Sequence, residues 1–316
     1  MMKTLRIGTR NSPLALAQAN WVAREIEAQS DGGVTCELVS MTTSGDQLQD
    51  RSLLAAGGKG LFTKELDIAL EAGEVDLLVH SLKDVPVELP IGQRIIAYPK
   101  REDPRDAFVS LKYESFDDLP EGATLGTSSL RRRAFALAKR PDLKVVEFRG
   151  NVQTRLRKLE EGVADATFLA SAGLNRLALE EKVGRPLDPN SFLPAVGQGI
   201  LGLAAYPDKL DEDVLGWVTG LNDVTAERAA LAERAALTEL DGSCRTPIAA
   251  HLFHEGTGVY RLNVRVAHPS GAPFYEAEDT LEGLELFLQD FRALGHKVAK
   301  KLIEDAGGEL PHLEVI

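Results

Sequence analysis

Two successive runs in which short apolar strands alternate with amphipathic helices occupy the first 170 residues of this chain. The first run predicts strands at residues 5–8, 34–41, 75–79 and 94–98. Its helices are predicted from Pro13 to about Gln29 and after Thr63, which can cap the second helix. The second run predicts strands at 123–126, 144–148 and 166–170 and helices at 129–139 and 152–161. This alternation is typical of open α/β sheets, so the sequence predicts two similar α/β lobes.

Two breaks divide the chain. Residues 99–105 carry two prolines and are predicted to be a linker, and residues 194–199 form a glycine-bearing break, after which residues 201–206 return to the first lobe as a strand. The remaining part predicts a helix at 225–240, strands at 247–253 and 259–267, and a helix at 283–303. The predicted domains are a first lobe at 1–99 plus 200–220, an arginine-rich second lobe at 105–195, and a small α+β C-terminal domain at 223–316.

Composition limits the function classes that this chain can serve. A net charge of −12 argues against general nucleic-acid binding, which depends on neutralising phosphates. The sequence has no run of 18 apolar residues and no secretory signal at its start, so we expect a cytoplasmic protein without a membrane span. The two cysteines should be thiols, and no spacing of His or Cys predicts a metal site.

A basic segment at residues 126–176 stands out in this acidic chain. It contains eleven Arg and Lys and five Asp and Glu, a local charge of +6. Arg131 and Arg132 follow Ser129 at the start of one predicted helix, and Arg149 and Arg155 flank the start of the next. Helix starts attract anions, and arginines grip carboxylates or phosphates through paired hydrogen bonds. The alternative is a solvated helix face; we favour an anion site, because adjacent Arg131 and Arg132 should point in different directions and only a concave site could use both.

Two other segments carry candidate chemistry. Residues 80–86 (HSLKDVP) follow a buried strand, where open α/β sheets place ligands, so Lys83 and Asp84 are candidates for a site. A surface ion pair at a turn is the alternative, and His80 is more simply a packed side chain. Residues 241–245 (DGSCR) place Cys244 on a loop beside an arginine, which favours a thiolate; an idle cysteine is the other reading.

Nine segments in order resemble the porphobilinogen deaminase family. They are LRIGTRNSPLALAQ (5–18), GGKGLFTKEL (57–66), HSLKDVP (80–86), REDPRDAF (101–108), GTSSLRR (126–132), FRGNVQTRL (148–156), LASAGLNRL (169–177), PAVGQG (194–199) and DGSCRTPIAA (241–250). The resemblance implies periplasmic-binding-protein-like lobes joined by two crossings. It also implies an enzyme that adds four porphobilinogen units head to tail, with loss of ammonia, to a dipyrromethane cofactor attached through Cys244. Hydrolysis then releases hydroxymethylbilane for haem biosynthesis.

The resemblance also implies roles for individual residues. Asp84 would be catalytic. The cofactor carboxylates would be held by Arg131, Arg132 and Arg155, with Lys83 and Ser129 nearby. The substrate or growing chain would be bound by Arg10, Ser12, Arg149 and Arg176, with Gln198 lining the cleft. Lys59 and Phe62 would belong to a mobile loop, and the family leads us to expect a monomer.

One departure and two alternatives remain open. After PAVGQG the family usually has an acidic residue and then an arginine, whereas this chain has Ala204-Ala205-Tyr206, so no such role is expected there.

A solute-binding protein would share the two-lobed plan, although the absent signal peptide and Cys244 speak against it. A nucleic-acid-binding regulator using the basic segment is the second alternative, and the acidic composition weighs against it.

Overall fold

The structure, a computed structural model, describes residues 2–47, 60–179, 184–240, 246–308 and 310. The chain forms two compact units, Met1–Glu102 with Gly199–Ala230, and Asp103–Gln198 with Leu231–Ile316. It therefore passes between the units inside both predicted breaks and once more after residue 230. The second unit contains the second lobe together with the C-terminal elements, so the predicted division into three domains stays a prediction.

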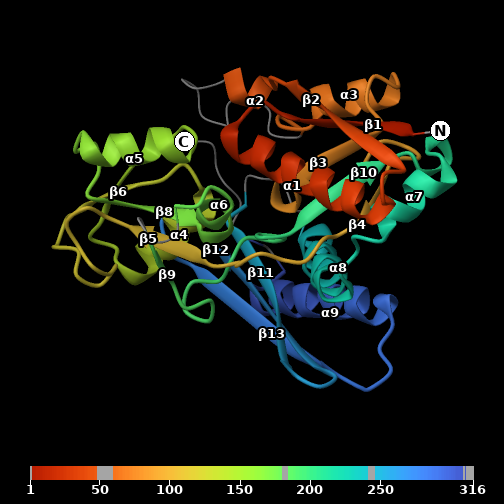
Figure 1. Ribbon diagram of the computed structural model, residues 1–316. Helices are drawn as coiled ribbons and strands as arrows, with labels where there is room; N and C mark the ends of the chain where they lie inside the picture. Colours follow the sequence, from red (N-terminus) through yellow and green to blue (C-terminus); the bar gives the residue numbers. More distant parts are fainter. Residues whose placement is uncertain (1, 48–59, 180–183, 241–245, 309, 311–316) are drawn as a thin grey trace. The chain divides into compact units, whose positions relative to one another are not determined.

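The first unit contains a five-stranded mixed sheet with the order β2-β1-β3-β10-β4 (Figure 1). Its strands are β1 (Lys3–Arg10), β2 (Val34–Met41), β3 (Leu77–Ser81), β4 (Arg94–Ala97) and β10 (Leu201–Ala205). Its helices are α1 (Pro13–Ser30), α2 (Ser44–Gln47), α3 (Lys64–Glu71), α7 (Glu212–Thr219) and the 3₁₀ turns η1 (Leu82–Asp84) and η2 (Pro207–Lys209). β1 pairs in parallel with β2 and β3, whereas β10 is antiparallel to β3 and β4. The predicted return of residues 201–206 to the first lobe is thus confirmed.

Side chains on both faces of this sheet are buried, because helices cover both. Leu77 and Val79 of β3 pack into the cluster formed with α1 and α7, while Leu78 packs against α3 on the other face. Burial on both faces explains why β3 is a continuous apolar run rather than an alternating one. The strand ends two residues later than predicted, so His80 and Ser81 belong to it. Thr63 precedes α3 as expected, but its side chain makes no capping hydrogen bond, which corrects that expectation.

The second lobe repeats this plan. Its sheet has the order β7-β6-β8-β5-β9, with β6 parallel to β7 and β8 and with β5 antiparallel to β8 and β9. Its elements are β5 (Asp106–Val109), β6 (Thr124–Gly126), α4 (Leu130–Lys139), β7 (Lys144–Val146), α5 (Val152–Glu160), β8 (Ala166–Ala170), α6 (Ser171–Arg176) and β9 (Arg185–Pro186). The sequence missed β5, because four residues directly after a proline-bearing linker give too short a pattern to recognise. The prediction of two similar α/β lobes is confirmed.

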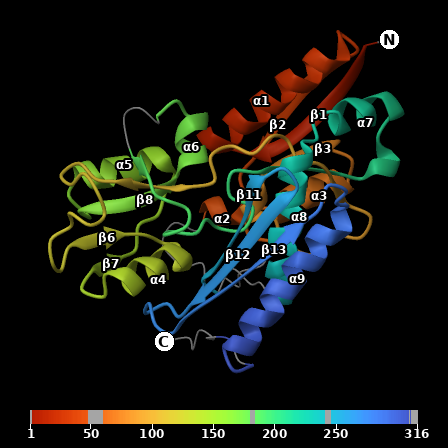
Figure 2. The same ribbon diagram turned by 90° about the horizontal axis from the view of Figure 1, so that it is seen from below.

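The C-terminal elements form an antiparallel sheet, β11-β12-β13, with helices (Figure 2). They are α8 (Val224–Glu239), β11 (Ile248–Gly256), β12 (Val259–Ala267), β13 (Phe274–Glu282) and α9 (Leu288–Asp305), and α9 packs on β12 and β13. Strand β13 was not predicted, because only Ala277 in it is buried and its acidic residues hide the alternation. The prediction of a helix from residue 283 was wrong at its start, since β13 and a turn occupy the chain up to Phe287.

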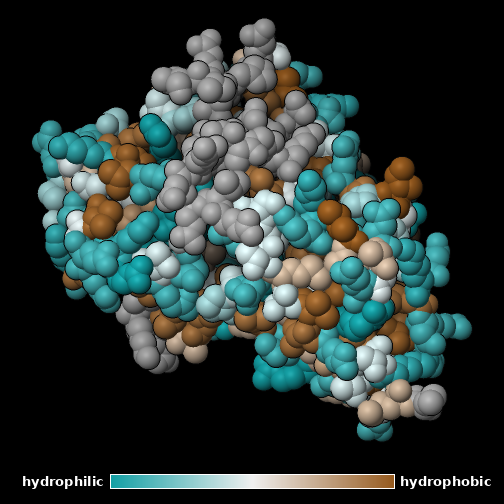
Figure 3. All heavy atoms as spheres, turned by 90° about the horizontal axis from the view of Figure 1, so that it is seen from above, coloured by the Kyte–Doolittle hydropathy of each residue, from teal (hydrophilic) through white to brown (hydrophobic). Residues whose placement is uncertain are grey.

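None of the helices in the described ranges is both long and apolar enough to cross a membrane. Large exposed apolar side chains such as Ile91, Leu111 and Val163 lie far apart in the sequence. On the face drawn in Figure 3, apolar residues are scattered among hydrophilic ones.

Close packing of α9 on α8 depends on Gly295. A Cβ atom at this position would lie 2.3 Å from the carbonyl oxygen of Ala232 and 2.7 Å from the Cβ of Ala235. We expect Gly295→Ala to lower the free energy of unfolding by about 1–3 kcal/mol, measured by urea denaturation. The matched control is Gly216→Ala in α7, where no atom lies within 4 Å, and which should leave stability unchanged or raise it by about 0.5–1 kcal/mol. Equal midpoints for the two variants would contradict this account.

Candidate active site

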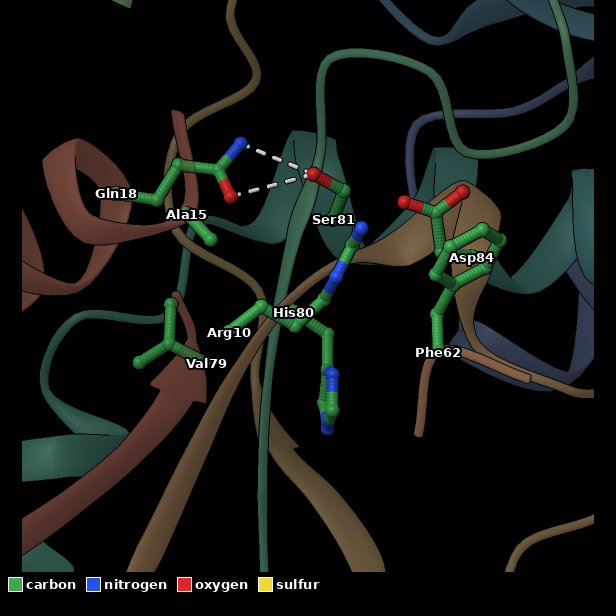
Figure 4. A pocket seen from close by; sticks show the side chains of 8 residues that line it. All are labelled: Arg10, Ala15, Gln18, Phe62, Val79, His80, Ser81 and Asp84. Atoms are coloured by element: carbon green, nitrogen blue, oxygen red, sulfur yellow. Dashed lines mark hydrogen bonds between the residues drawn. The ribbon is translucent and has the colours of Figure 1, made fainter. Parts of the chain in front are cut away.

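A small recess opens in the first unit where β1 and β3 end. Because these strands are parallel, their carboxyl ends lie at the same edge of the sheet, which is where open α/β sheets bind ligands. The recess is lined by side chains from β1, α1, β3 and η1 and by Phe62 (Figure 4). Its lining residues are Arg10, Ala15, Gln18, Phe62, Val79, His80, Ser81 and Asp84.

Two side chains from the end of β3 have clear environments. The Gln18 amide of α1 donates a hydrogen bond of 3.0 Å to the Ser81 hydroxyl, which fixes both groups at the wall of the recess. His80 is buried, and this burial, together with the charge of Arg10, lowers its pKa to about 4. His80 is therefore neutral at neutral pH, as the interpretation of a packed side chain requires.

Asp84 sits in the η1 turn directly after β3. The turn is attached to the sheet, because the Leu82 N–H donates to the Ile200 carbonyl at 2.9 Å and the Val85 N–H donates back to Leu82 at 3.1 Å. Within the described ranges, no hydrogen bond or ion pair occupies the Asp84 carboxylate, which is partly exposed at the recess. The backbone of Asp84 is thus fixed while its carboxylate is open to a ligand. Lys83, its neighbour, is exposed.

Arg10 brings a positive charge to the same recess. Its guanidinium forms a two-point ion pair with Asp46 and lies over the Phe62 ring, with 4.3 Å between Cζ and the ring centre. Figure 4 shows Arg10 extending toward the side where Ser81 and Asp84 lie. Ser12 has a structural role, since its hydroxyl caps α1 by accepting from the Ala15 N–H.

In the second unit, Arg131 and Arg132 both bind one carboxylate, that of Asp106. Arg131 Nη2 donates to one Asp106 oxygen at 2.6 Å, and Arg132 Nε and Nη2 donate to the other at 3.0 and 2.6 Å. All three side chains are buried. Burial opposes ionisation of Asp106, but the charges of the two arginines outweigh it and lower its pKa to about 2.

This convergence corrects the sequence argument that adjacent arginines must diverge. The side chains are long enough to turn toward one another, and backbone carbonyls hold their remaining ends. Arg131 Nη1 donates to Leu193 O and Arg132 Nη1 donates to Phe168 O, each at 2.8 Å. One buried carboxylate can therefore bind both arginines, so their presence does not by itself require a concave anion site.

The two buried guanidinium groups share a single carboxylate, so one positive charge stays unbalanced among these three side chains. Arg155 adds to it: burial, with the nearby charges of Arg132 and Arg149, lowers its pKa to about 10, although Glu147 opposes the shift. The buried Arg131 Nε has no hydrogen-bond partner within the described part of the chain. Excess buried positive charge with an unused N–H group is an environment that an anion would stabilise.

Four more predicted residues of the second lobe lie in or just before α4, α5 and α6. Ser129 caps α4, and its hydroxyl accepts from the Arg132 N–H. Arg149, before α5, pairs with Glu147 at 2.5 Å. Arg155 Nε donates to the Gly150 carbonyl at 2.9 Å. The charges of Arg132 and Arg149 both act on Arg155, so the arginines of the two helix starts lie near one another in the lobe. Arg176 ends α6 and is half-buried.

Gln198 is buried behind the arginine cluster. Its amide donates to Pro104 O at 2.7 Å and to Asp106 Oδ1 at 3.2 Å, so it helps to hold the shared carboxylate. Direct contact of Gln198 with a substrate stays a prediction. Cys244 and Lys59 lie outside the described residues. Among those that are described, no group of three or more His, Cys, Asp or Glu could hold a metal ion.

Sequence reasoning missed Asp106 and Asp46, the two carboxylates that hold these arginines. Asp106 directly follows the linker predicted at 99–105 and was noted only as part of the motif REDPRDAF, and Asp46 lies in a polar stretch without a recognisable pattern. The only available signal was indirect: buried arginines need a carboxylate partner, and REDPRDAF supplies acidic residues near a crossing.

Comparisons with known proteins agree across the chain. A family model described as "Porphobilinogen deaminase, dipyromethane cofactor binding domain" matches residues 5–213, and one described as "Porphobilinogen deaminase, C-terminal domain" matches residues 226–304. A curated porphobilinogen deaminase from Nitrobacter winogradskyi is 49% identical over 304 residues, covering 95% of this chain and 93% of the relative. The corresponding protein of Nitrobacter hamburgensis is 48% identical over 302 residues, with the same coverage.

Solved structures give a weaker likeness. A TRAP periplasmic solute binding protein from Desulfovibrio salexigens matches with a TM-score of 0.44 and 14% identity, over 73% of this chain and 74% of its own. The methionine binding protein MetQ matches with a TM-score of 0.44 and 16% identity, over 73% and 94% respectively. Likenesses at this level carry no information about activity.

The shared carboxylate of Asp106 should control acid stability. Its pKa lies below the ordinary value of 3.8, so its stabilisation is present above about pH 4 and is lost as the pH falls toward about 2. Asp106→Asn leaves two buried cations without a counter-charge, so it should lower the free energy of unfolding at pH 7 by about 3–5 kcal/mol. When the pH falls from 4 to 2, the variant should lose less stability than the parent protein. Urea denaturation across that pH range measures both effects. Asp142→Asn, which breaks the more exposed pair with Arg140, is the control and should change little; an equal loss in both variants would contradict the assignment.

Proposed function

Because this chain belongs to the porphobilinogen deaminase family and is an enzyme of tetrapyrrole biosynthesis, we propose that it joins four porphobilinogen units on a dipyrromethane attached through Cys244. Each addition releases ammonia, and hydrolysis finally frees hydroxymethylbilane. The observation that carries this proposal is the buried, unbalanced positive charge of the second lobe. Porphobilinogen units each bear an acetate and a propionate, so a chain built from them needs many cationic partners.

The arginine cluster fits the cofactor. In the described ranges Arg131 and Arg132 share the Asp106 carboxylate, the charge of Glu147 acts on Arg155, and Arg131 Nε has no partner. We assign these three arginines, with Lys83 and Ser129, to the cofactor carboxylates. When bound, the dipyrromethane supplies the pyrrole carbon to which the first substrate is joined. Burial, together with the charges of Arg132 and Arg149, lowers the pKa of Arg155, and the cofactor carboxylates would oppose this shift.

The recess in the first lobe fits the reacting pyrrole. Arg10 would take a carboxylate of the substrate, and Ser12, Arg149, Arg176 and Gln198 would bind the substrate or the growing chain. Phe62 lies beside Arg10 at the recess, consistent with a place next to the substrate ring, and Lys59 and Phe62 would belong to one loop.

Asp84 would carry the proton transfers. The aminomethyl group is protonated, its carbon–nitrogen bond then breaks, ammonia leaves with the bonding electron pair, and the pyrrole is left as a cation. A carboxylate that accepts the pyrrole N–H hydrogen bond stabilises that cation. A new carbon–carbon bond then forms, and the proton displaced from the attacked pyrrole carbon needs a base. Asp84 has its backbone fixed to the sheet and its carboxylate open, as both tasks require.

We also assign this chain to the cytoplasm as a monomer. The absence of a membrane-spanning helix from the described residues is compatible with that assignment. A monomer would bind one cofactor, which a mass measurement under native conditions would detect together with the oligomeric state.

Cysteine substitution tests the attachment of the cofactor. Cys244→Ser should remove both activity and the added mass of two linked pyrrole units, which intact mass spectrometry measures. Cys36→Ser is the matched control, because burial raises the pKa of the Cys36 thiol to about 12 and makes it a poor nucleophile. A Cys244→Ser protein that keeps the added mass and its activity would end the assignment.

Asp84→Ala tests the proton-transfer role. We expect kcat to fall by about 10²–10⁴-fold while the cofactor mass and the melting temperature stay near those of the parent protein. Glu88→Ala, an exposed carboxylate four residues further on, should keep full activity. A change of less than a few-fold in kcat for Asp84→Ala would remove Asp84 from the chemistry.

A further inference from the structure

Arg10 is held along one edge by Asp46. Its Nε and Nη2 face the two oxygens of the Asp46 carboxylate, with 3.3 Å between Nε and Oδ2. Both side chains are about four-fifths buried, at 23% and 22% exposed, so water screens this pair only in part. A guanidinium paired in this way cannot rotate freely about its last bonds.

Asp46 is itself fixed by its own turn. The Thr43 N–H and hydroxyl donate to Asp46 Oδ2 at 3.2 and 2.8 Å, and the Asp46 N–H donates to Thr43 O at 2.9 Å. Burial opposes ionisation of Asp46, but the hydrogen bonds from Arg10 and Thr43 outweigh it and lower its pKa. The carboxylate is therefore charged and fixed in direction at neutral pH.

The same turn also supports the face of Arg10. The Phe62 ring lies under the guanidinium and packs on Gly45, where a Cβ atom would approach the ring to 2.3 Å. The Gly45 N–H donates to Leu61 O at 2.8 Å, which joins the Phe62 segment to this turn. Residues 43–46 thus hold one edge of the Arg10 guanidinium through Asp46, and they support its flat face through the Phe62 ring that packs on Gly45.

We propose that Asp46 is a positioning residue for substrate binding. An arginine has a second edge, formed by Nη1 and Nη2, that can take another carboxylate in two-point fashion. Asp46 occupies the first edge, and Arg10 lines the recess beside Ser81 and Asp84, so the second edge is the one left for a porphobilinogen carboxylate. This inference rests on the substrate role of Arg10 proposed above.

The arrangement has a chemical consequence for the bound substrate. A carboxylate gripped at two points by a fixed arginine sets the orientation of the pyrrole ring relative to Asp84. Asp46 also balances part of the Arg10 charge, which weakens binding of stray anions. Its removal should therefore affect substrate capture more than the chemical step.

Steady-state kinetics of Asp46→Ala and Asp46→Asn with porphobilinogen test this inference. In Asp46→Ala, KM should rise by about tenfold, because the loss of one well-aligned charged hydrogen bond weakens binding by about that factor. The value of kcat should change by less than about twofold. Asp46→Asn keeps one acceptor oxygen and should lie between this variant and the parent. Cofactor mass should stay unchanged in both, whereas the melting temperature should fall modestly in Asp46→Ala, because this variant loses a partly buried ion pair.

The matched control lies on the same strand. Arg6 and Asp76 form an equivalent two-point pair away from the recess, so Asp76→Ala should leave KM unchanged. In an Arg10→Ala background, which has a raised KM if the proposed substrate role is correct, Asp46→Ala should add nothing further.

Three outcomes distinguish the positioning role of Asp46 from the substrate role of Arg10. An unchanged or lowered KM in Asp46→Ala overturns the positioning role, and a lowered KM would mean that Asp46 competes with substrate. An additional effect in the Arg10→Ala background also overturns it. A normal KM in Arg10→Ala alone contradicts the substrate role of Arg10, whatever Asp46 does.

Discussion

The binding of two arginines by the Asp106 carboxylate is the interaction on which the second lobe depends. Buried guanidinium groups are stable only when a counter-charge and hydrogen-bond acceptors surround them. Asp106, Leu193 O and Phe168 O supply these partners, and Gln198 holds Asp106 in turn. One carboxylate cannot balance two cations, so this part of the second lobe carries excess positive charge while the total charge of the chain is −12.

In the first lobe, too, a carboxylate holds an arginine, but this ion pair is less buried. Asp46 holds Arg10 as Asp106 holds Arg131 and Arg132, but it is about one-fifth exposed, whereas Asp106 is fully buried. The difference suits the two proposed ligands. A cofactor that stays in place through every cycle is matched by a buried cluster, and a substrate that arrives and moves on is matched by an arginine near the surface.

The sequence predicted the lobes well because their strands and helices carry local patterns. Strands at 34–41 and 166–170 and the helix from Pro13 were placed correctly, since their periodicity and caps lie within a few residues. The same reasoning could not find Asp106 as the partner of Arg131, because 25 residues and a folded sheet separate the two. β13 was missed for another reason: a strand with one buried residue has almost no apolar alternation to detect. The motifs identified the family, but contacts between distant side chains needed the structure.

The attachment of Asp84 to the sheet has a further meaning for a reaction that repeats four times. Leu82, two residues before it, is fully buried and is bonded to β10 through Ile200. A carboxylate mounted on so rigid a base cannot follow the end of a chain that lengthens by one ring at every turn. With Asp84 in its proposed role, the reaction point would be stationary relative to the first sheet, and the growing product would have to move past it. If Arg10 binds the substrate as proposed, each completed ring would leave the recess before the next porphobilinogen enters, and the chain would lengthen by moving past a fixed carboxylate.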